Sequence, residues 1–216
     1  WHSILVGGLR SGGQGIYALN VTDPPPFSDS NASSLVMWEF TDADDADLGY
    51  TFSRPNVVKM ADGTWVAVFG NGYNNTESDG HASSTGEAVL YIVNVQTGAL
   101  IKKISTGVGS SQDPTGASRP NGLATVTPID VNQDGVIDYI YGGDLFGNLW
   151  KFDVTSTSAG SWDVAVHASG AAAPLFKACG GNSFTSSNVQ SITTRVTVGY
   201  GPNRIGYMIY LGTGKY

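Results

Sequence analysis

One stretch of the sequence, DVNQDGVID at residues 130–138, gathers side chains that suit the binding of a hard cation. The oxygen-bearing side chains alternate along the stretch and are those of Asp130, Asn132, Asp134 and Asp138. Gly135 permits a sharp turn, so these oxygens can converge on one point, to which Val136 can add its backbone carbonyl. About six or seven flexibly spaced oxygens suit Ca²⁺, whereas Mg²⁺ retains more water and Zn²⁺ selects Cys or His. We therefore predict a calcium site in this stretch.

The stretch differs from an EF-hand, although it begins with the same pattern. Tyr141 stands where an EF-hand has its bidentate Glu, and apolar, strand-like residues flank the stretch in place of helices. A solvated polar turn is the alternative, since Asn and Asp are common in turns. The stretch contains no Lys or Arg to neutralise its carboxylates, and this favours the calcium prediction.

A second acidic stretch, DADDAD at residues 42–47, lacks the glycine turn and the strict alternation. Its carboxylates are those of Asp42, Asp44, Asp45 and Asp47. We interpret it as a solvated loop and not as a metal site, because runs of like charge are usually hydrated.

No combination of residues in the sequence predicts catalysis. The single cysteine, Cys179, has no histidine near it in sequence and is interpreted as a buried or loop thiol. The three histidines, His2, His81 and His167, lie far apart in the sequence. No G-x-S-x-G or H-E-x-x-H motif occurs, so the protein is predicted not to be an enzyme.

The elements that must position the calcium stretch are predicted to be short β-strands. Helical periodicity is nearly absent, and β-branched and aromatic runs recur between Gly, Asn, Asp and Pro. Four similar runs end in glycine: ILVGGL, VAVFGNG, DYIYGGD and MIYLGTG. Their first glycines, which we predict to be equivalent, are Gly7, Gly70, Gly142 and Gly212.

This repeat predicts an all-β fold, a β-propeller with four-stranded antiparallel blades. Residues 1–216 are expected to form a single segment of about three to four blades, a partial ring with both ends truncated inside blades. A linear β-sandwich is the alternative, and it explains the repeat less well. The calcium stretch then lies at a hairpin tip where the preceding repeat has only ADG at residues 61–63.

The charge and hydropathy of the chain exclude two classes of partner. A net charge of −7 with scattered Lys and Arg disfavours nucleic acid, whose binders carry a basic patch. No apolar run approaches the length of a membrane span, about 18 residues or more.

Several stretches, taken in order along nearly the whole chain, resemble the C-terminal propeller of the PilY family of Gram-negative bacteria. They are GGQGIYALNVTDP, MWEF, DLGYTFSRPNVVKMADGTWVAVFGNGY, LYIVNVQTG, DVNQDGVIDYIYGGDLFGNLWKFDV and YLGTGKY. The resemblance implies a modified β-propeller at or near the tip of a type IV pilus, at the cell surface. It implies pilin subunits or minor pilins as partners, and possible contact with a host or abiotic surface.

The resemblance also implies a role in pilus biogenesis, extension and retraction, twitching motility and surface attachment. The calcium loop of the family maps onto Asp130, Asn132, Asp134, Val136 and Asp138, with Asn132 where other members often carry Asp. In the family, calcium occupancy is linked to the balance between extension and retraction.

Two other classes of propeller remain open. LYIVNVQTGALI and GDLFGNLWKFDV are also similar to blade motifs of quinoprotein dehydrogenases, which hold pyrroloquinoline quinone, but a lone Cys179 cannot supply their cysteine pair. Integrin-like propellers carry calcium loops at hairpin tips in several successive blades, whereas here only one blade has the loop.

Overall fold

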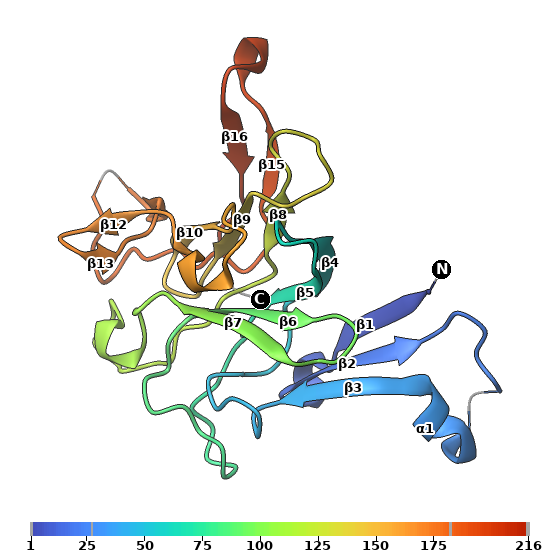
Figure 1. The fold of residues 1–216 in the computed structure, drawn as a ribbon. Coiled ribbons are helices and arrows are strands. Elements are labelled where there is room, and N and C mark those ends of the chain that lie inside the picture. The colour runs from blue at the N-terminus through green and yellow to red at the C-terminus, as the bar shows by residue number, and fades with distance from the viewer. Residues whose placement is uncertain (1, 27, 182, 215–216) are drawn as a thin grey trace.

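The computed structural model describes residues 2–26, 28–181 and 183–214, and its regular structure is mainly antiparallel β-sheet (Figure 1). The helices are a single turn or little more: η1 (Arg10–Gly12), η2 (Asp29–Asn31), α1 (Ala32–Leu35), η3 (Ser110–Gln112), η4 (Ala159–Ser161) and η5 (Pro202–Arg204). None of the helices in these described ranges is long and apolar enough to cross a membrane.

The first sheet has the order β1-β2-β3, with strands Ile4–Gly8, Gly15–Asn20 and Val36–Thr41. The second sheet has the order β4-β5-β6-β7, with strands Asn56–Lys59, Trp65–Gly70, Val89–Asn94 and Leu100–Ser105. Each strand in the second sheet pairs with the one before it in sequence. This is the meander predicted for a propeller blade.

The third sheet repeats this order but divides its last strand. Its strands β8, β9, β10 and β11 are Thr127–Ile129, Tyr139–Gly143, Asn148–Asp153 and Asp163–Val164. A further short strand, β14 (Phe176–Lys177), pairs with the other end of β10. The segment between them forms a separate hairpin of β12 (His167–Ala168) and β13 (Ala171–Ala172).

The last described strands, β15 (Thr197–Tyr200) and β16 (Tyr207–Tyr210), form a hairpin that projects beyond the other sheets in Figure 1. The three larger sheets and this last hairpin are successive units of the predicted all-β propeller, and over the described residues they do not close into a ring. The fold-class prediction is therefore confirmed.

Apolar side chains fill the space between neighbouring sheets. Ile16, Phe40, Phe69 and Tyr91 belong to the cluster between the first and second sheets. Val68, Leu90, Trp150 and Phe152 belong to the cluster between the second and third. Tyr141, Leu149, Ile192 and Val196 form much of the cluster beside the last hairpin. The core therefore lies between blades, so each blade depends on its neighbours for burial.

In the second sheet, the two middle strands β5 and β6 are nearly unbroken apolar runs because both of their faces are covered. Successive side chains of a strand point to opposite faces. In β6, Val89, Tyr91 and Val93 pack toward the first sheet, whereas Leu90 and Ile92 pack toward the third. Both faces of this strand are buried, so no polar alternation is possible.

Strand pairing shifts two of the glycines that were predicted to be equivalent. An aromatic residue marks the same position in each of the first three sheets: Tyr17, Tyr91 and Trp150. Their partners on the preceding strand are Gly7, Phe69 and Gly142. Gly70 therefore corresponds to Gly8 and Gly143. The predicted alignment, which matched Gly70 with Gly7 and Gly142, was wrong by one residue in the first and third sheets.

These equivalent glycines lie where neighbouring blades approach most closely. A Cβ at Gly70 would lie 2.4 Å from the Leu123 carbonyl oxygen. A Cβ at Gly8 would lie 2.7 Å from the Thr51 oxygen, and one at Gly143 would overlap the Ile192 side chain. The requirement for glycine is thus steric and recurs from blade to blade.

Candidate functional site

The predicted calcium stretch forms the connection between β8 and β9 in the third sheet. The equivalent connection in the second sheet is the tight turn at residues 61–63, where the Asp62 side chain accepts the backbone N–H of Thr64 at 2.8 Å. The two tips are neighbours, because Ile137 N–H donates to the Lys59 carbonyl at 3.0 Å. The longer loop is therefore an addition to a hairpin that a short turn can close.

Asp130 organises the turn of the loop through its carboxylate. Its Oδ1 accepts the backbone N–H of Gln133 at 2.6 Å, and its Oδ2 accepts that of Gly135 at 2.8 Å. Gln133 and Gly135 both have positive φ, at 64° and 85°. The chain therefore curls around the Asp130 side chain, with glycine where the left-handed conformation is easiest.

The other predicted side-chain ligands also lie within the loop. Asn132 Nδ2 donates to Asp134 Oδ2 at 3.0 Å, and Asp134 Oδ1 accepts the N–H of Val136 at 2.8 Å. Asp138 Oδ2 accepts the N–H of Val131 at 2.7 Å, which ties the start of the loop to its end. The loop is thus closed by its own carboxylate and amide side chains.

The donor set fits Ca²⁺ in kind, since it offers carboxylate, amide and backbone carbonyl oxygens. Within the described ranges, however, no group of three or more His, Cys, Asp or Glu side chains is arranged around a common point for a metal ion. The carboxylates instead accept backbone N–H groups. Ca²⁺ binding would require the side chains of Asp130, Asp134 and Asp138 to turn toward a shared centre.

Two tyrosines of the last hairpin contact the loop, a feature that the sequence did not predict. Tyr207 Oη donates to the Val131 carbonyl at 3.2 Å, and Gln133 Nε2 donates to Tyr200 Oη. The two rings stack with centroids 5.5 Å apart. Burial, Tyr200 and the nearby carboxylates of Asp138 and Asp130 raise the pKa of Tyr207. The hairpin and the loop therefore form one continuous contact.

Only a weak signal in the sequence marks this contact. Tyrosines recur along GYGPNRIGYMIY, a pattern typical of a hairpin with aromatic cross-strand pairs. The partners Gln133 and Tyr200 are separated by 67 residues, so only the fold brings them together.

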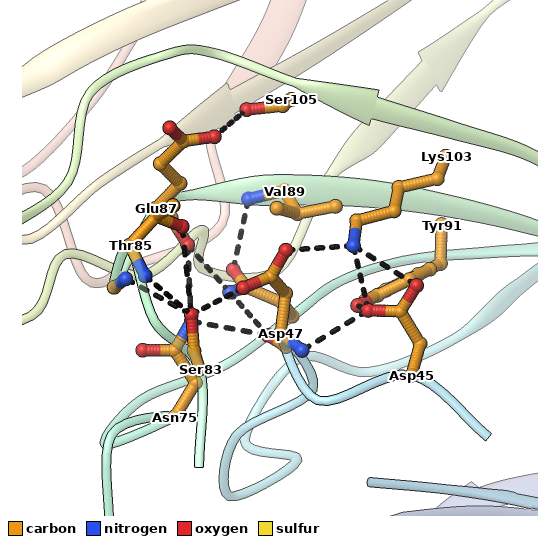
Figure 2. Close-up of polar contacts among 12 residues, drawn as sticks. Asp45, Asp47, Asn75, Ser83, Thr85, Glu87, Val89, Tyr91, Lys103 and Ser105 are labelled. Atoms are coloured by element: carbon orange, nitrogen blue, oxygen red, sulfur yellow. Dashed lines mark hydrogen bonds and ion pairs between the residues drawn. The ribbon is translucent and has the colours of Figure 1, made fainter. Parts of the chain in front are cut away.

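The second acidic stretch is only partly the solvated loop that the sequence suggested: Asp44 is exposed, but Asp45 and Asp47 are not (Figure 2). The side chains of Asp45 and Asp47 are only 16% and 17% exposed, and Lys103 of β7 lies between them. Lys103 Nζ is 2.7 Å from Asp45 Oδ1 and 2.6 Å from Asp47 Oδ2, while Tyr91 Oη donates to Asp45 at 2.8 Å. The cation held by this stretch is thus an ammonium group of the same chain.

The electrostatics of this cluster are mutually stabilising. Burial by itself would raise the pKa of Asp45, but hydrogen bonds from Lys103, the Asp47 backbone and Tyr91 bring it below its usual value. Burial by itself would lower the pKa of Lys103, but Asp45 and Asp47 raise it overall. Burial and Asp45 raise the pKa of Tyr91.

The same network continues into the β5–β6 connection and to the last residue of β7, as Figure 2 shows. Ser83 Oγ donates to Asp47, and Ser105 Oγ donates to Glu87. Asn75 Nδ2 donates to the Asp47 and Glu87 carbonyls at 3.2 Å, leaving its buried Oδ1 without a partner among the described residues. We interpret the cluster as a structural link between the first and second sheets.

A buried carboxylate at Asp144 forms a comparable node in the third sheet. It lies directly after Gly143, and its oxygens accept five N–H groups, from the backbones of Phe146 and Asn148 and the side chains of Asn121, Asn148 and Trp150. Burial raises the pKa of Asp144, and these donors oppose that effect. Asn71, directly after Gly70, occupies the equivalent place in the second sheet.

The residues considered for catalysis are dispersed. His2, His81 and His167 are exposed, and His167 Nε2 lies 3.5 Å from Asp163. Cys179 is half-buried, and its thiol faces the Gly181 carbonyl at 3.5 Å. Within the described ranges, none of these four residues forms a nucleophile–base pair.

Comparison with known proteins places these features in a family. The family model for the PilY1 beta-propeller domain matches residues 1–216. A type IV pilus biogenesis factor PilY1 homolog from Xylella fastidiosa is 41% identical over 100% of this chain, which spans 14% of that relative. Type IV pilus biogenesis factor PilY1 from Pseudomonas aeruginosa (strain UCBPP-PA14) is 38% identical over 100% of this chain, which spans 18% of it.

A solved structure supports the same relationship. The crystal structure of the Pseudomonas aeruginosa PilY1 C-terminal domain is similar to this chain with a TM-score of 0.77 and 35% sequence identity. The match covers 100% of this chain and 41% of that one.

Proposed function

Because the chain belongs to the PilY1 β-propeller domain family, we propose that it is a calcium-binding structural part of a type IV pilus biogenesis factor. Its role is to present a rigid surface at the pilus or cell surface of a Gram-negative bacterium. Pilin subunits or minor pilins are the proposed partners. The chain spans 14% and 18% of two curated relatives, so the roles in extension, retraction, twitching and attachment are proposed for the whole protein.

One observation carries the calcium proposal: the extra loop at residues 130–138 concentrates oxygen donors at a tip that a short turn closes in the preceding blade. The proposed ligands are the side chains of Asp130, Asn132, Asp134 and Asp138 and the carbonyl of Val136. Ca²⁺ would supply positive charge at the centre of the loop. We expect an affinity of about 10⁻⁶ to 10⁻³ M, since the set has no bidentate Glu and includes a neutral Asn.

The loop is in a position to pass on the effect of calcium, because it contacts the β15–β16 hairpin through Gln133 and Val131. Turning the Asp130 carboxylate toward an ion would release the N–H groups of Gln133 and Gly135. A change in the Gln133 backbone would then alter the contact with Tyr200. We propose that this is how calcium changes the outer surface of the propeller.

We propose no catalytic activity for this chain. The quinoprotein alternative needs a cysteine pair, and the sequence has one cysteine. No turnover of alcohols with added quinone and a dye acceptor is expected; quinone-dependent dye reduction would contradict the proposal.

Calcium binding can be tested by isothermal titration of the full-length protein and two variants. Asp134→Ala should weaken binding by roughly tenfold or more, the scale seen even when a supporting partner of a metal ligand is lost. Asp62→Ala, which changes the equivalent tip of the preceding blade, is the matched control and should bind as wild type does. Equal binding by the wild type and Asp134→Ala would exclude this loop as the site.

A further inference from the structure

A hollow of about 420 Å³ lies near the starts of β4, β8 and β15, which we call the inner strands. The calcium loop lies at the opposite end of β8. Thr125 lines it and comes just before β8, whereas the calcium loop follows β8. The wall also includes Arg10 from the β1–β2 connection, Arg54 before β4 and Arg195 before β15. Three separate units of the propeller thus each direct an arginine to one hollow.

The composition of this wall contrasts with that of the protein. The chain has five arginines and a net charge of −7, yet three of the arginines line this hollow. No Asp or Glu is among the residues that line it. The hollow is therefore a local concentration of positive charge on an acidic protein.

The arginines have few partners of their own. Among the described residues, no carboxylate oxygen lies within 4.0 Å of Arg10, Arg54 or Arg195, whereas Arg119 binds Asp113 at 2.8 Å. Arg195 Nε donates to Thr127 Oγ1 at 3.3 Å, and the Arg10 guanidinium lies 5.8 Å from the Phe52 ring centre. Most of the guanidinium N–H donors are left available.

The fold holds these residues at corresponding places in successive blades. Arg54, Thr125 and Arg195 each lie two residues before the first paired residue of an inner strand, namely Asn56, Thr127 and Thr197. Arg54 N–H also donates to Thr125 Oγ1 at 3.1 Å, which joins neighbouring blades. The propeller repeat thus sets the positions of two of the three positive groups, those of Arg54 and Arg195, while Arg10 reaches the hollow from the β1–β2 connection.

We propose that this hollow binds a carboxylate group, which the arginines recognise through paired N–H donors. A guanidinium presents a planar fork that matches the two oxygens of a carboxylate. Like charges around one space repel one another, and an anion between them removes that repulsion. Phe52, Pro55 and Val6 add an apolar part to the wall, which suits the carbon chain of an organic acid better than a bare inorganic anion. The proposal does not depend on calcium binding.

Two sources can supply the carboxylate: a free organic acid, or an acidic side chain of another protein segment. Citrate is the probe for the first source, titrated calorimetrically into the full-length protein at low salt. Binding by the wild type that weakens at least about tenfold in the Arg54→Gln/Arg195→Gln double variant would support a free acid as the ligand. Arg204→Gln, which changes an exposed arginine in η5, is the matched control and should bind as wild type does.

The second source gives a different result. If an acidic side chain of the same protein fills the hollow, citrate does not bind, and the double variant has a lower thermal midpoint than the Arg204→Gln control. Absence of citrate binding together with an unchanged midpoint would overturn the proposal. Inorganic phosphate binding as tightly as citrate would overturn the preference for a carboxylate. Circular dichroism of each variant confirms that the exposed substitutions leave the fold intact.

Discussion

At the scale of single residues, the glycine at the end of each second strand sets how closely two blades can approach. Gly70 is fully buried, and a Cβ there would lie 2.4 Å from the Leu123 oxygen and 2.5 Å from that of Ala124. Both atoms belong to the backbone of the next blade, so no side-chain rotation can relieve the overlap. A larger residue must therefore separate the second and third blades.

We predict that Gly70→Ala lowers the free energy of unfolding by about 1–3 kcal/mol, the usual scale of overpacking. The measurement is the urea midpoint of the full-length protein. Gly160→Ala is the control, since its added Cβ would come no closer than 3.6 Å to another group, the Ser158 hydroxyl. That variant should stay within about 0.5 kcal/mol of wild type. Equal midpoints for the two variants would show that the blades can separate at no cost.

Asn71, the residue after this glycine, has a structural role of its own. Asn71 Oδ1 accepts the N–H groups of Val89 and Leu123, and Nδ2 donates to the Asp47 and Glu87 carbonyls. The Asp144 carboxylate accepts from five donors, four of them on residues 146–150 and one on Asn121 in the β7–β8 connection. The two nodes thus satisfy buried polar groups in different ways at one place in the repeat.

At the scale of elements, the β15–β16 hairpin depends on the loop for much of its polar contact with the third sheet. Removing the hydroxyl groups of Tyr200 and Tyr207 breaks the contacts with Gln133 and Val131 and keeps the ring stack. We predict that a Tyr200→Phe/Tyr207→Phe variant exchanges the amides of residues 197–210 roughly fivefold faster, which corresponds to about 1 kcal/mol for a hydrogen bond.

Hydrogen–deuterium exchange with and without Ca²⁺ tests this prediction and its link to calcium. In the wild type, Ca²⁺ should change exchange in both the loop and the hairpin; in the double variant it should change the loop alone. Tyr210→Phe is the control, because the Tyr210 hydroxyl faces Met208 Sδ at 3.6 Å and not the loop. A hairpin that responds to Ca²⁺ equally in all three proteins would rule out transmission through these hydroxyls.

The elements themselves could be predicted from sequence because each strand carries its own local signal. Residues 89–94 and 148–153 are apolar and aromatic runs between turn residues, and they form β6 and β10. Residues 163–177 carry no such run, and the fourth strand of the third blade is accordingly divided between β11 and β14. The glycine alignment failed only at Gly7–Gly8 and Gly142–Gly143, where two neighbouring glycines fit the pattern equally well.

The long-range contacts could not be predicted, because nothing local marks them. Lys103 lies 58 residues from Asp45, and no sequence pattern connects it to an acidic loop. The same holds for the arginines around the hollow, which come from three units of the repeat. The oxygen donors of residues 130–138 were recognisable because they lie within one short loop, although whether they bind calcium remains a prediction.

At the scale of the whole molecule, ion pairs hold the connections between blades and make stability depend on pH. The Arg119 side chain, 2.8 Å from Asp113, holds the pKa of Asp113 well below its usual value, and the Lys103 cluster lowers that of Asp45. Carboxylates with lowered pKa stabilise the fold above their unfolded pKa, and that contribution is lost as the pH falls. Lys103 has a raised pKa, so its contribution is present below about 10.5 and is lost as the pH rises further.

We therefore predict that the urea midpoint of the full-length protein is highest between about pH 4 and pH 10 and falls on both sides. Burial raises the pKa of Asp144, so protonation of this group opposes the loss of stability at low pH. Variants are therefore compared to identify which ion pair causes that loss. Arg119→Gln should lower the midpoint at pH 7 and shrink the difference between pH 7 and pH 3, since the pKa of Asp113 is then no longer held down. Arg204→Gln should keep the wild-type difference. If the difference in urea midpoint between pH 7 and pH 3 is the same in Arg119→Gln as in the wild type, this ion pair does not cause the loss of stability at low pH. Other carboxylates would then be responsible for that loss.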